Sequence, residues 1–136
     1  MNQYTQTAQS TFAITSWDET PFDEHEDGSK LSRASIVKSY EGSLSGQGTS
    51  EQLASYLPDG SGQFSAVERF RGSLDGRQGT FVLQHTGTFQ NGTVQSIWKV
   101  VPGSATGDLA GLRGEIVFEA GHAPSYPIKF EYEIQE

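Results

Sequence analysis

The C-terminal residues alternate between apolar and polar side chains, and this pattern constrains the fold more than any other feature of the chain. The apolar positions are Ile128, Phe130, Tyr132 and Ile134, and charged or polar residues stand between them. A period of two places one set on the core face of a β-strand and the other in water. Similar alternation recurs along the chain, and helical periodicity is nearly absent. The sequence therefore predicts an all-β protein.

About nine candidate strands, most of them short, follow from this alternation. Besides residues 128–134, they are residues 11–17, 30–40, 43–57 (in one or two pieces), 63–74, 79–90, 93–101, 104–109 and 114–120. Short turns join them, and the pairs Asp75-Gly76 and Asn91-Gly92 are strong hairpin signals. Regular spacing of this kind favours a single antiparallel β-barrel, because closure removes exposed sheet edges. A two-sheet sandwich is the alternative.

The 136 residues fit one domain, residues 1–136, with three segments that depart from the strand pattern. Residues 1–10 are expected to be loosely held. Residues 18–29, DETPFDEHEDGS, are predicted to form an acidic loop, because Pro21 and Gly28 oppose regular structure. Residues 45–50 are rich in glycine and serine, which indicates a bulge or a loop between two strand halves.

The charge and the cysteine count restrict the partners. Seventeen acidic and nine basic residues give a net charge of −8, and the arginines are scattered, so neither nucleic acid nor a membrane is expected as a partner. The absence of cysteine removes disulfides and thiolate chemistry and is compatible with a reducing cytoplasm. No signal peptide or long apolar run is present. We expect a soluble, cytoplasmic protein.

No metal or cofactor is expected. The three histidines, His25, His85 and His122, lie on different segments, which argues against a zinc site. The acidic loop lacks the alternating oxygen ligands and central glycine of a calcium loop.

Residues 104–115, SATGDLAGLRGE, carry three closely spaced glycines that allow two interpretations, a phosphate-binding loop or a barrel corner. A Walker-type loop needs lysine and then serine or threonine after its glycines, whereas Glu115 follows Gly114 here. The glycines are better interpreted as positions of positive φ or of close backbone approach between two strands. In this interpretation Gly107 lets the backbone bend, and Gly111 and Gly114 lie in the turn between two strands.

The string TGDLAGLRGE resembles the corner motif of the allene oxide cyclase-like and dirigent-like barrels. The resemblance assigns the motif positions to Thr106, Gly107, Leu109, Gly111 and Gly114. Together with GQFSAVERFRGSLDGRQGTFVLQHTGTF at residues 62–89 and VVPGSATGDLAGLRGE at residues 100–115, it resembles a bacterial family of small domains of unknown function placed in that superfamily. The resemblance runs from about residue 31 onward. It implies an eight-stranded antiparallel barrel with glycine-rich corners and a central cavity. It implies no activity and no catalytic residue, because a shared fold is not a shared function.

Glu68 and His85 are the candidate catalytic residues, because both share a strand face with apolar residues. A four-residue loop between residues 64–74 and 79–89 would set them directly opposite each other, and a two-residue turn at Asp75-Gly76 would make them diagonal neighbours. Either register leaves them within reach of a hydrogen bond. They can satisfy each other inside the barrel, anchor the polar end of a ligand, or act as a general acid and base.

The apolar residues on the same faces complete a candidate ligand-binding set. It contains Glu68, His85, Phe64, Phe70, Phe81, Leu83, Phe89 and Tyr132, and Tyr40, Tyr56 and Trp98 are further candidates that serve equally as plain core. The preferred hypothesis is the binding of a small apolar molecule in the cavity. The alternatives are a cofactor-independent isomerase or cyclase using Glu68 and His85, and a barrel filled by its own aromatic residues that acts as a protein interaction module.

Residues 93–101 carry large apolar side chains on both faces. Trp98 shares one face with Val94 and Val100, and Ile97 and Val101 lie on the other. Apolar residues on the outside of a barrel indicate a covered surface, so we expect a homo-oligomer.

Overall fold

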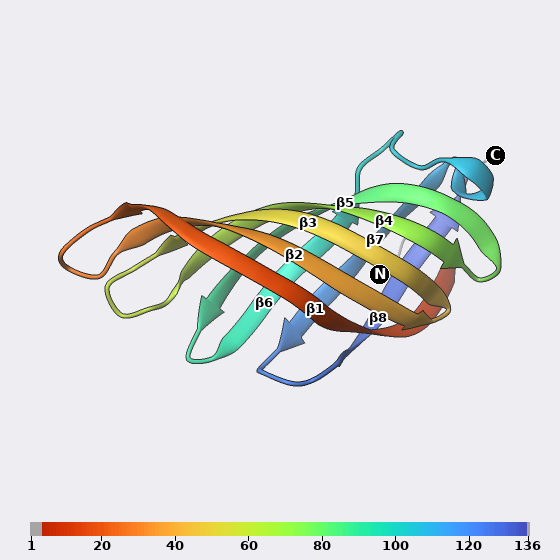
Figure 1. The fold of residues 1–136 in the computed structure, drawn as a ribbon. Helices are drawn as coiled ribbons and strands as arrows, with labels where there is room; N and C mark the ends of the chain where they lie inside the picture. Colours follow the sequence, from red (N-terminus) through yellow and green to blue (C-terminus); the bar gives the residue numbers. More distant parts are fainter. Residues whose placement is uncertain (1–3, 136) are drawn as a thin grey trace.

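The computed structural model describes residues 4–135, which form one closed antiparallel barrel of eight strands (Figure 1). Each strand pairs with its neighbours in sequence, and the first pairs with the last. The strands are β1 (Gln6–Glu24), β2 (Lys30–Gly42), β3 (Leu44–Tyr56), β4 (Gly62–Leu74), β5 (Arg77–Gln90), β6 (Thr93–Val100), β7 (Leu112–Ala120) and β8 (Tyr126–Ile134), with one short 3-10 helix, η1 (Gly107–Leu109), between β6 and β7. The predicted all-β, eight-stranded barrel is confirmed, and the sandwich is excluded.

The first strand is longer than predicted, and most of the acidic loop belongs to it. β1 extends to Glu24 because it pairs with β2 along its whole length, with two bulges, one of them beside Pro21. Beyond Phe12 the other side of β1 has no strand partner, and such an edge tolerates proline. The loop shrinks to residues 25–29. Residues 6–10, predicted to be loose, pair with β8, and residues 1–3 lie outside the described part of the chain.

Two further expectations about the strands were wrong. Residues 45–50 neither bulge nor loop out but lie within the continuous strand β3, because each of them pairs with β4. Residues 104–109 form a turn that ends in η1 and not a strand. The backbone N–H of Thr106 donates to the carbonyl of Thr80 on β5, so this segment is held against the barrel rim without joining the ladder.

The two hairpin signals are confirmed as two-residue turns. Asp75 and Gly76 have φ values of 49° and 86°, and Asn91 and Gly92 have values of 53° and 76°. Positive φ at both positions is the geometry of a type I′ turn. The turn at Asp75-Gly76 pairs Leu74 with Arg77 and thereby determines the register of β4 against β5.

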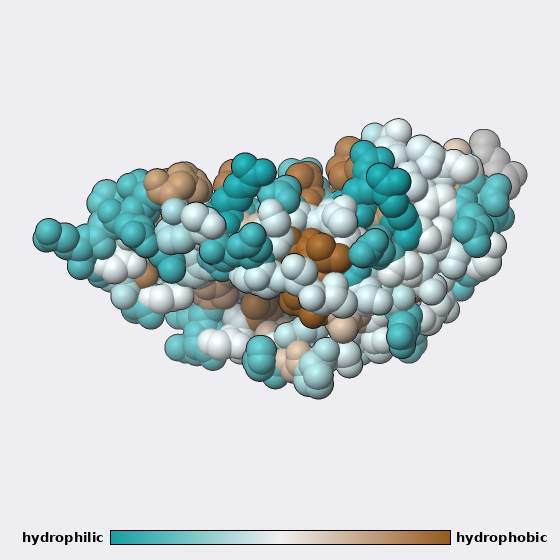
Figure 2. Space-filling view, in the orientation of Figure 1, coloured by the Kyte–Doolittle hydropathy of each residue, from teal (hydrophilic) through white to brown (hydrophobic). Residues whose placement is uncertain are grey.

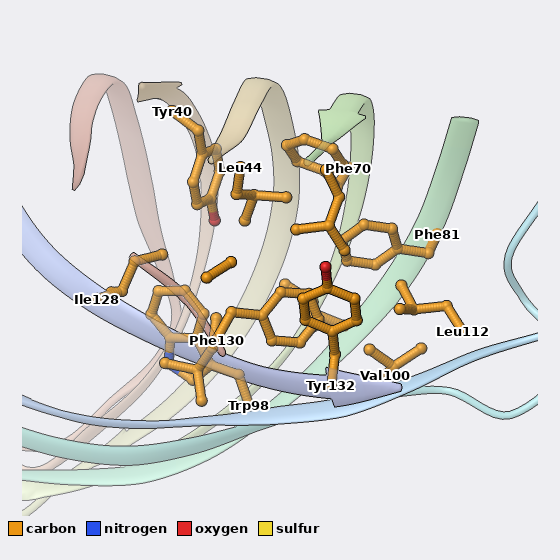
Figure 3. Packing of buried hydrophobic residues seen from close by; sticks show 14 of the residues in the cluster. Tyr40, Leu44, Phe70, Phe81, Trp98, Val100, Leu112, Ile128, Phe130 and Tyr132 are labelled. Atoms are coloured by element: carbon orange, nitrogen blue, oxygen red, sulfur yellow. The ribbon is translucent and has the colours of Figure 1, made fainter. Parts of the chain in front are cut away.

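One end of the barrel is filled by its own side chains (Figure 3). Aromatic rings pack together there: the Phe81 ring lies 4.9 Å from that of Phe70, its partner on the adjacent strand β4, and 6.0 Å from that of Phe130 on β8, measured between ring centroids. Leu109 of η1 is fully buried and closes this end like a plug. The remaining fully buried hydrophobic residues of this end include Leu44, Leu74, Leu83, Leu112 and Ile116.

The opposite end is open. β1 pairs with β8 only from Gln6 to Phe12, and from there β1 and β2 continue as a long arm that overhangs the barrel (Figure 1). The tips of the long hairpins are hydrophilic, and apolar residues gather nearer the middle of the face shown in Figure 2. Within residues 4–135, no helix has the length and hydropathy needed to cross a membrane.

Candidate functional site

A cavity of about 290 Å³ lies inside the open end of the barrel. Most of its wall is apolar, and a few polar side chains lie among these residues. The apolar lining residues are Phe12, Ile14, Trp17, Ile36, Phe64, Ala66, Phe89, Val94, Trp98, Phe118, Ala120 and Tyr126, and the polar ones are Lys38, Ser50, Gln52, Tyr56, His85 and Ser96. Small-molecule sites typically enclose about 300–1,000 Å³ with a few convergent polar groups, so this cavity suits a small, amphipathic molecule.

The carboxylate of Glu68 joins the polar side chains behind the cavity wall. Lys38 Nζ lies 3.0 Å and His85 Nε2 lies 2.8 Å from the same oxygen, Oε1. The hydroxyl of Tyr40 donates to the other oxygen, Oε2, at 2.5 Å. Glu68 is completely buried, and its three partners are nearly so. The four side chains come from three strands of the sheet: Lys38 and Tyr40 from β2, Glu68 from β4 and His85 from β5.

The register places these residues together. Glu68 pairs with Leu83 and His85 pairs with Ala66, so Glu68 and His85 are diagonal neighbours on the inner face, as a two-residue turn requires. Lys38 on β2 pairs with Gly48 on β3, which carries no side chain, so the lysine reaches Glu68 on β4 over the glycine. The network depends on this small residue between the two charged ones.

Burial and the neighbouring charges set the protonation states of the network. Burial alone would raise the pKa of Glu68, but the charge of Lys38 and the hydrogen bonds from His85 and Tyr40 outweigh it and lower the pKa to about 2. Burial lowers the pKa of His85 below its ordinary value, and the charge of Lys38 adds to this against the opposing effect of Glu68. At neutral pH Glu68 is therefore a carboxylate and His85 a neutral imidazole.

These states determine the tautomer of His85. A carboxylate can only accept a hydrogen bond, so Nε2 of His85 carries the proton that it donates to Glu68. The other ring nitrogen, Nδ1, then holds a free lone pair. Among residues 4–135, Ser32 Oγ is the one fully buried side-chain polar atom without a hydrogen bond. Nδ1 also has no hydrogen bond in this part of the chain, so it is not fully buried, and the ring that carries it lines the cavity.

Lys38 is the member of the buried network that sequence analysis missed. Its ammonium group lies 4.3 Å from the centre of the Trp98 ring and 5.0 Å from that of Phe12, within the range of cation–π contacts. The signal was present in the strand alternation: Lys38 is in phase with Ala34, Ile36 and Tyr40, all of which are buried. A lysine in the middle of a core-facing row needs a buried acidic partner.

The structure divides the proposed ligand-binding residues between the two ends of the barrel. Phe64, Phe89 and His85 line the cavity, and Glu68 lies directly behind it. Phe70, Phe81, Leu83 and Tyr132 belong to the closed core instead. The reason is their position along the strands, since each strand crosses the whole barrel and only half of its inward residues reach the open end.

The candidate tyrosines divide in the same way. At the closed end the hydroxyl of Tyr132 lies within hydrogen-bond distance of Gln6 Oε1 and Asp75 Oδ2, and the hydroxyl of Tyr40 donates to Glu68. Tyr56 and Trp98 line the cavity. If the barrel were filled throughout by its own aromatic residues, Phe64, Phe70, Phe81, Phe89 and Trp98 would meet in one closed core. Phe70, Phe81 and Trp98 do belong to one buried cluster, whereas Phe64 and Phe89 lie outside it and stack on each other.

The glycine motif lies at the closed end, and none of its residues lines the cavity at the open end. Gly107 and Gly111 have φ values of 65° and 88°, and a Cβ atom on Gly114 would lie 2.7 Å from the carbonyl oxygen of Glu131. The hydroxyl of Thr106 lies 2.7 Å from that of Thr80, and Leu109 enters the core. The motif therefore shapes the plug that closes the barrel.

The acidic tip of the β1–β2 hairpin holds no metal-binding cluster. His25 contacts Asp23 at 3.2 Å, but both side chains are exposed. Throughout residues 4–135, no group of three histidine or acidic side chains is arranged to hold a metal ion.

The outer face carries a row of uncharged residues that runs across five strands. Leu53 pairs with Ser65, Ser65 with Thr86, Thr86 with Ile97 and Ile97 with Val117. All five residues point away from the barrel interior and line a shallow outer groove of about 890 Å³. Val117 is 74% exposed, which is unusual for a valine in a strand.

The fold and the site define a small antiparallel barrel that is filled at one end, hollow at the other, and crossed by a buried lysine–glutamate–histidine network. The sequence profile of the family described as "Protein of unknown function (DUF3224)" matches residues 8–132. The chain belongs to the DUF3224 family.

A crystal structure supports the same relationship. The protein of unknown function from the DUF3224 family of Shewanella oneidensis MR-1 is similar to this chain, with a TM-score of 0.76 and 28% sequence identity. The alignment covers 96% of this chain and 99% of the Shewanella protein. A comparison with curated proteins gives no match.

Proposed function

We propose that the chain binds a small, largely apolar molecule in the open end of the barrel, with one polar group directed at Lys38 and His85. The observation that carries the proposal is the cavity itself, an apolar enclosure of about 290 Å³ with an ammonium group and an imidazole in its wall. Burying apolar surface contributes about 25 cal/mol per Å², and the two polar groups orient the ligand.

The polar group of the ligand is a neutral carbonyl or hydroxyl group. Glu68 already balances the charge of Lys38, so a carboxylate ligand would bring an additional buried charge without a partner. A carbonyl oxygen can accept from the N–H groups that Lys38 does not use for Glu68, and a hydroxyl group can donate to Nδ1 of His85. We therefore expect 1-octanol to bind more tightly than octanoate.

Tryptophan emission tests this proposal directly. The chain has two tryptophans, Trp17 and Trp98, and both line the cavity, so a bound molecule changes their environment. Titration with 1-octanol is expected to shift the emission in a saturable way, and native mass spectrometry is expected to show one molecule per chain.

A pair of variants on β4 separates the cavity from the surface. Ala66→Met places a longer side chain into the cavity and is expected to abolish the response to 1-octanol. Val67→Met changes the next residue, which points outward and is half exposed, and is expected to bind like wild type. An unsaturable response, or equal binding by the two variants, would refute a site inside the barrel.

We also propose that the barrel is related to the allene oxide cyclase-like barrels and that the chain works in the cytoplasm. The first proposal is supported by the eight antiparallel strands in meander order, by the internal cavity and by the segment TGDLAGLRGE that closes one end of the barrel. The absence of cysteine from the sequence supports the second.

Self-association through the outer row is the proposed mode of assembly. The net charge of −8 makes two copies repel each other over most of their surfaces. The row from Leu53 to Val117 is uncharged and partly apolar, so a second copy can bury apolar area there without bringing like charges together.

A further inference from the structure

Two reactive groups of the network face the cavity side by side. His85 and Lys38 both contact Oε1 of Glu68, at 2.8 and 3.0 Å, and both line the cavity. His85 offers the lone pair of Nδ1, and the ammonium group of Lys38 keeps N–H donors beyond the one directed at Glu68. A proton acceptor and a cationic hydrogen-bond donor therefore converge on the same small apolar space.

We propose that this site catalyses proton transfer at the carbon next to the carbonyl group of a small apolar ketone, with His85 as general base and Lys38 as the donor to the carbonyl oxygen. The proposal rests on the proposed function, because the ketone must occupy the cavity of about 290 Å³. It goes further by naming the reacting bond, the substrate class and the role of each residue.

The reaction needs no cofactor and no oxidant. Nδ1 of His85 takes the proton from the α-carbon, and the electron pair of the broken C–H bond forms the C=C bond of an enolate. The negative charge that develops on the carbonyl oxygen is stabilised by the N–H donors of Lys38. The imidazolium ion then returns the proton, either to the same carbon or to the γ-carbon of a β,γ-unsaturated ketone, which moves the double bond into conjugation.

Glu68 is a positioning residue and not the base. Both of its oxygens are already bonded, Oε1 to Lys38 and His85 and Oε2 to Tyr40, and the side chain is completely buried behind the cavity wall. Its role is to hold the proton on Nε2 of His85, which leaves Nδ1 free, and to stabilise the imidazolium ion that forms during the reaction. Tyr40 keeps the carboxylate in place from the other side.

The surroundings favour this chemistry. Trp98 and Phe12 lie against the ammonium group of Lys38 and keep bulk water from it, so its interaction with a developing oxyanion is stronger than it would be in water. Trp98 also packs on the His85 ring, with 4.4 Å between the ring centroids, and so limits the orientations of the base.

Deuterium exchange into 2-tetralone tests the proposal. This ketone is small and apolar and has exchangeable α-protons, whose loss in D₂O can be followed by proton NMR. We expect the wild-type protein to accelerate the exchange above the same concentration of free imidazole. His85→Gln keeps the hydrogen bond to Glu68 but supplies no base, and is expected to lower the protein-dependent rate by about 100-fold or more.

Three comparisons make the experiment decisive. Binding of 2-tetralone and the thermal unfolding curve are measured for both proteins, so that a folding defect is recognised. His25→Gln, in the exposed hairpin tip, is expected to keep the full exchange rate. Glu68→Gln is expected to lower the rate and to move the rise of the pH–rate profile to lower pH, because the carboxylate no longer favours the imidazolium ion.

The two proposals fail in different ways. If wild type and His85→Gln bind 2-tetralone equally and show the same exchange rate, proton transfer is overturned and ligand binding stands. If neither 2-tetralone nor 1-octanol binds to wild type, both proposals are overturned. If Glu68→Gln lowers only the unfolding temperature and leaves the rate and its pH profile unchanged, the positioning role is wrong.

Discussion

Gly48 makes the space that the carboxylate of Glu68 occupies. A Cβ atom on Gly48 would lie 1.9 Å from Oε2 of Glu68, closer than real Cβ contacts come. That oxygen is the one that accepts the hydrogen bond from Tyr40, and the ring of Tyr40 lies 3.1 Å from the same Cβ position. The glycine on β3 is therefore as much a part of the buried network as the charged residues on β2 and β4.

Gly48→Ala is expected to displace the Glu68 side chain and to break at least the hydrogen bond from Tyr40. Losing a hydrogen bond to a buried charged group costs about 1.5–3 kcal/mol, and urea unfolding measures the change. Gly121→Ala is the control, since its nearest neighbour would lie 3.7 Å away, and it is expected to unfold like wild type. Equal stability of the two variants would contradict the crowding at Gly48.

Lys38→Met is expected to destabilise the protein strongly, because Glu68 would keep a buried charge without its ammonium partner. Removing one member of a buried ion pair costs about 3–5 kcal/mol. Arg33→Met on the same strand removes the exposed partner of Glu51, and exposed pairs contribute about 0–1 kcal/mol. Chemical denaturation of both variants measures the contrast, and a loss below 1 kcal/mol for Lys38→Met would show that the pair is not buried in solution.

Acid is expected to weaken the fold in two steps. In the folded protein the pKa of His85 is lowered from its ordinary value of 6.5. Below about pH 6.5 the unfolded chain therefore binds a proton at His85 that the folded protein does not bind, and the free energy of unfolding falls as the pH drops. The pKa of Glu68 is lowered from 4.5 to about 2, so the stability that its charge contributes is lost between those values.

His85→Gln identifies the first of these steps. In this variant the free energy of unfolding is expected to depend less steeply on pH just below 6.5, where one proton changes it by at most about 1.4 kcal/mol per pH unit. His25→Gln removes an exposed histidine and is expected to keep the wild-type slope. Urea denaturation at pH 4.5–7.5 makes the measurement, and parallel curves for wild type and His85→Gln would contradict a neutral, buried imidazole.

Phe81→Ala is expected to cost about 3–5 kcal/mol, because Phe81 is completely buried in the filled end and packs on Phe70 and Phe130. Phe22→Ala changes an exposed phenylalanine at the hairpin tip, and a loss below about 0.5 kcal/mol is expected. Thermal and urea unfolding test both. Since Phe81 lies outside the cavity, the folded Phe81→Ala protein is expected to keep its response to 1-octanol.

Val117→Glu is expected to abolish self-association. The substitution places a charge in the middle of the uncharged outer row, beside Ile97, so two copies that meet there would bury it. Light scattering at micromolar concentration measures the mass, and Asp108→Glu, a conservative exchange on exposed η1, serves as the control. A wild-type mass equal to one chain would contradict the proposed assembly.

The class of fold followed from the sequence, because strand alternation and turn chemistry are local properties. The alternation of β8 and the inward faces of β4 and β5 could be assigned residue by residue. The hairpins at Asp75-Gly76 and Asn91-Gly92 could be predicted, because few residue pairs adopt positive φ at both positions of a two-residue turn. The extent of β1 could not be predicted, because its second half is a strand only through pairing with β2.

Only part of the candidate site could be predicted from the sequence, for a similar reason. Glu68 and His85 share a hairpin, so their proximity depends on one short turn and follows from the sequence. Lys38 and Tyr40 reach Glu68 across β3, and the space for that contact is created by Gly48. Contacts between strands that are not adjacent depend on register and barrel curvature, which no local pattern encodes.

By itself, the sequence determined an all-β chain, its two tight hairpins and the inward direction of its acidic and imidazole side chains, because these depend on near neighbours. The tertiary structure alone decided that the barrel is filled at one end and hollow at the other. Phe70 and Phe81 lie in the core, whereas Phe64 and Phe89 line the cavity, although all four are inward-facing apolar positions in the sequence alternation. The physical reason is that a side chain's place along the barrel axis is set by closure of the whole sheet and by the plug at Leu109.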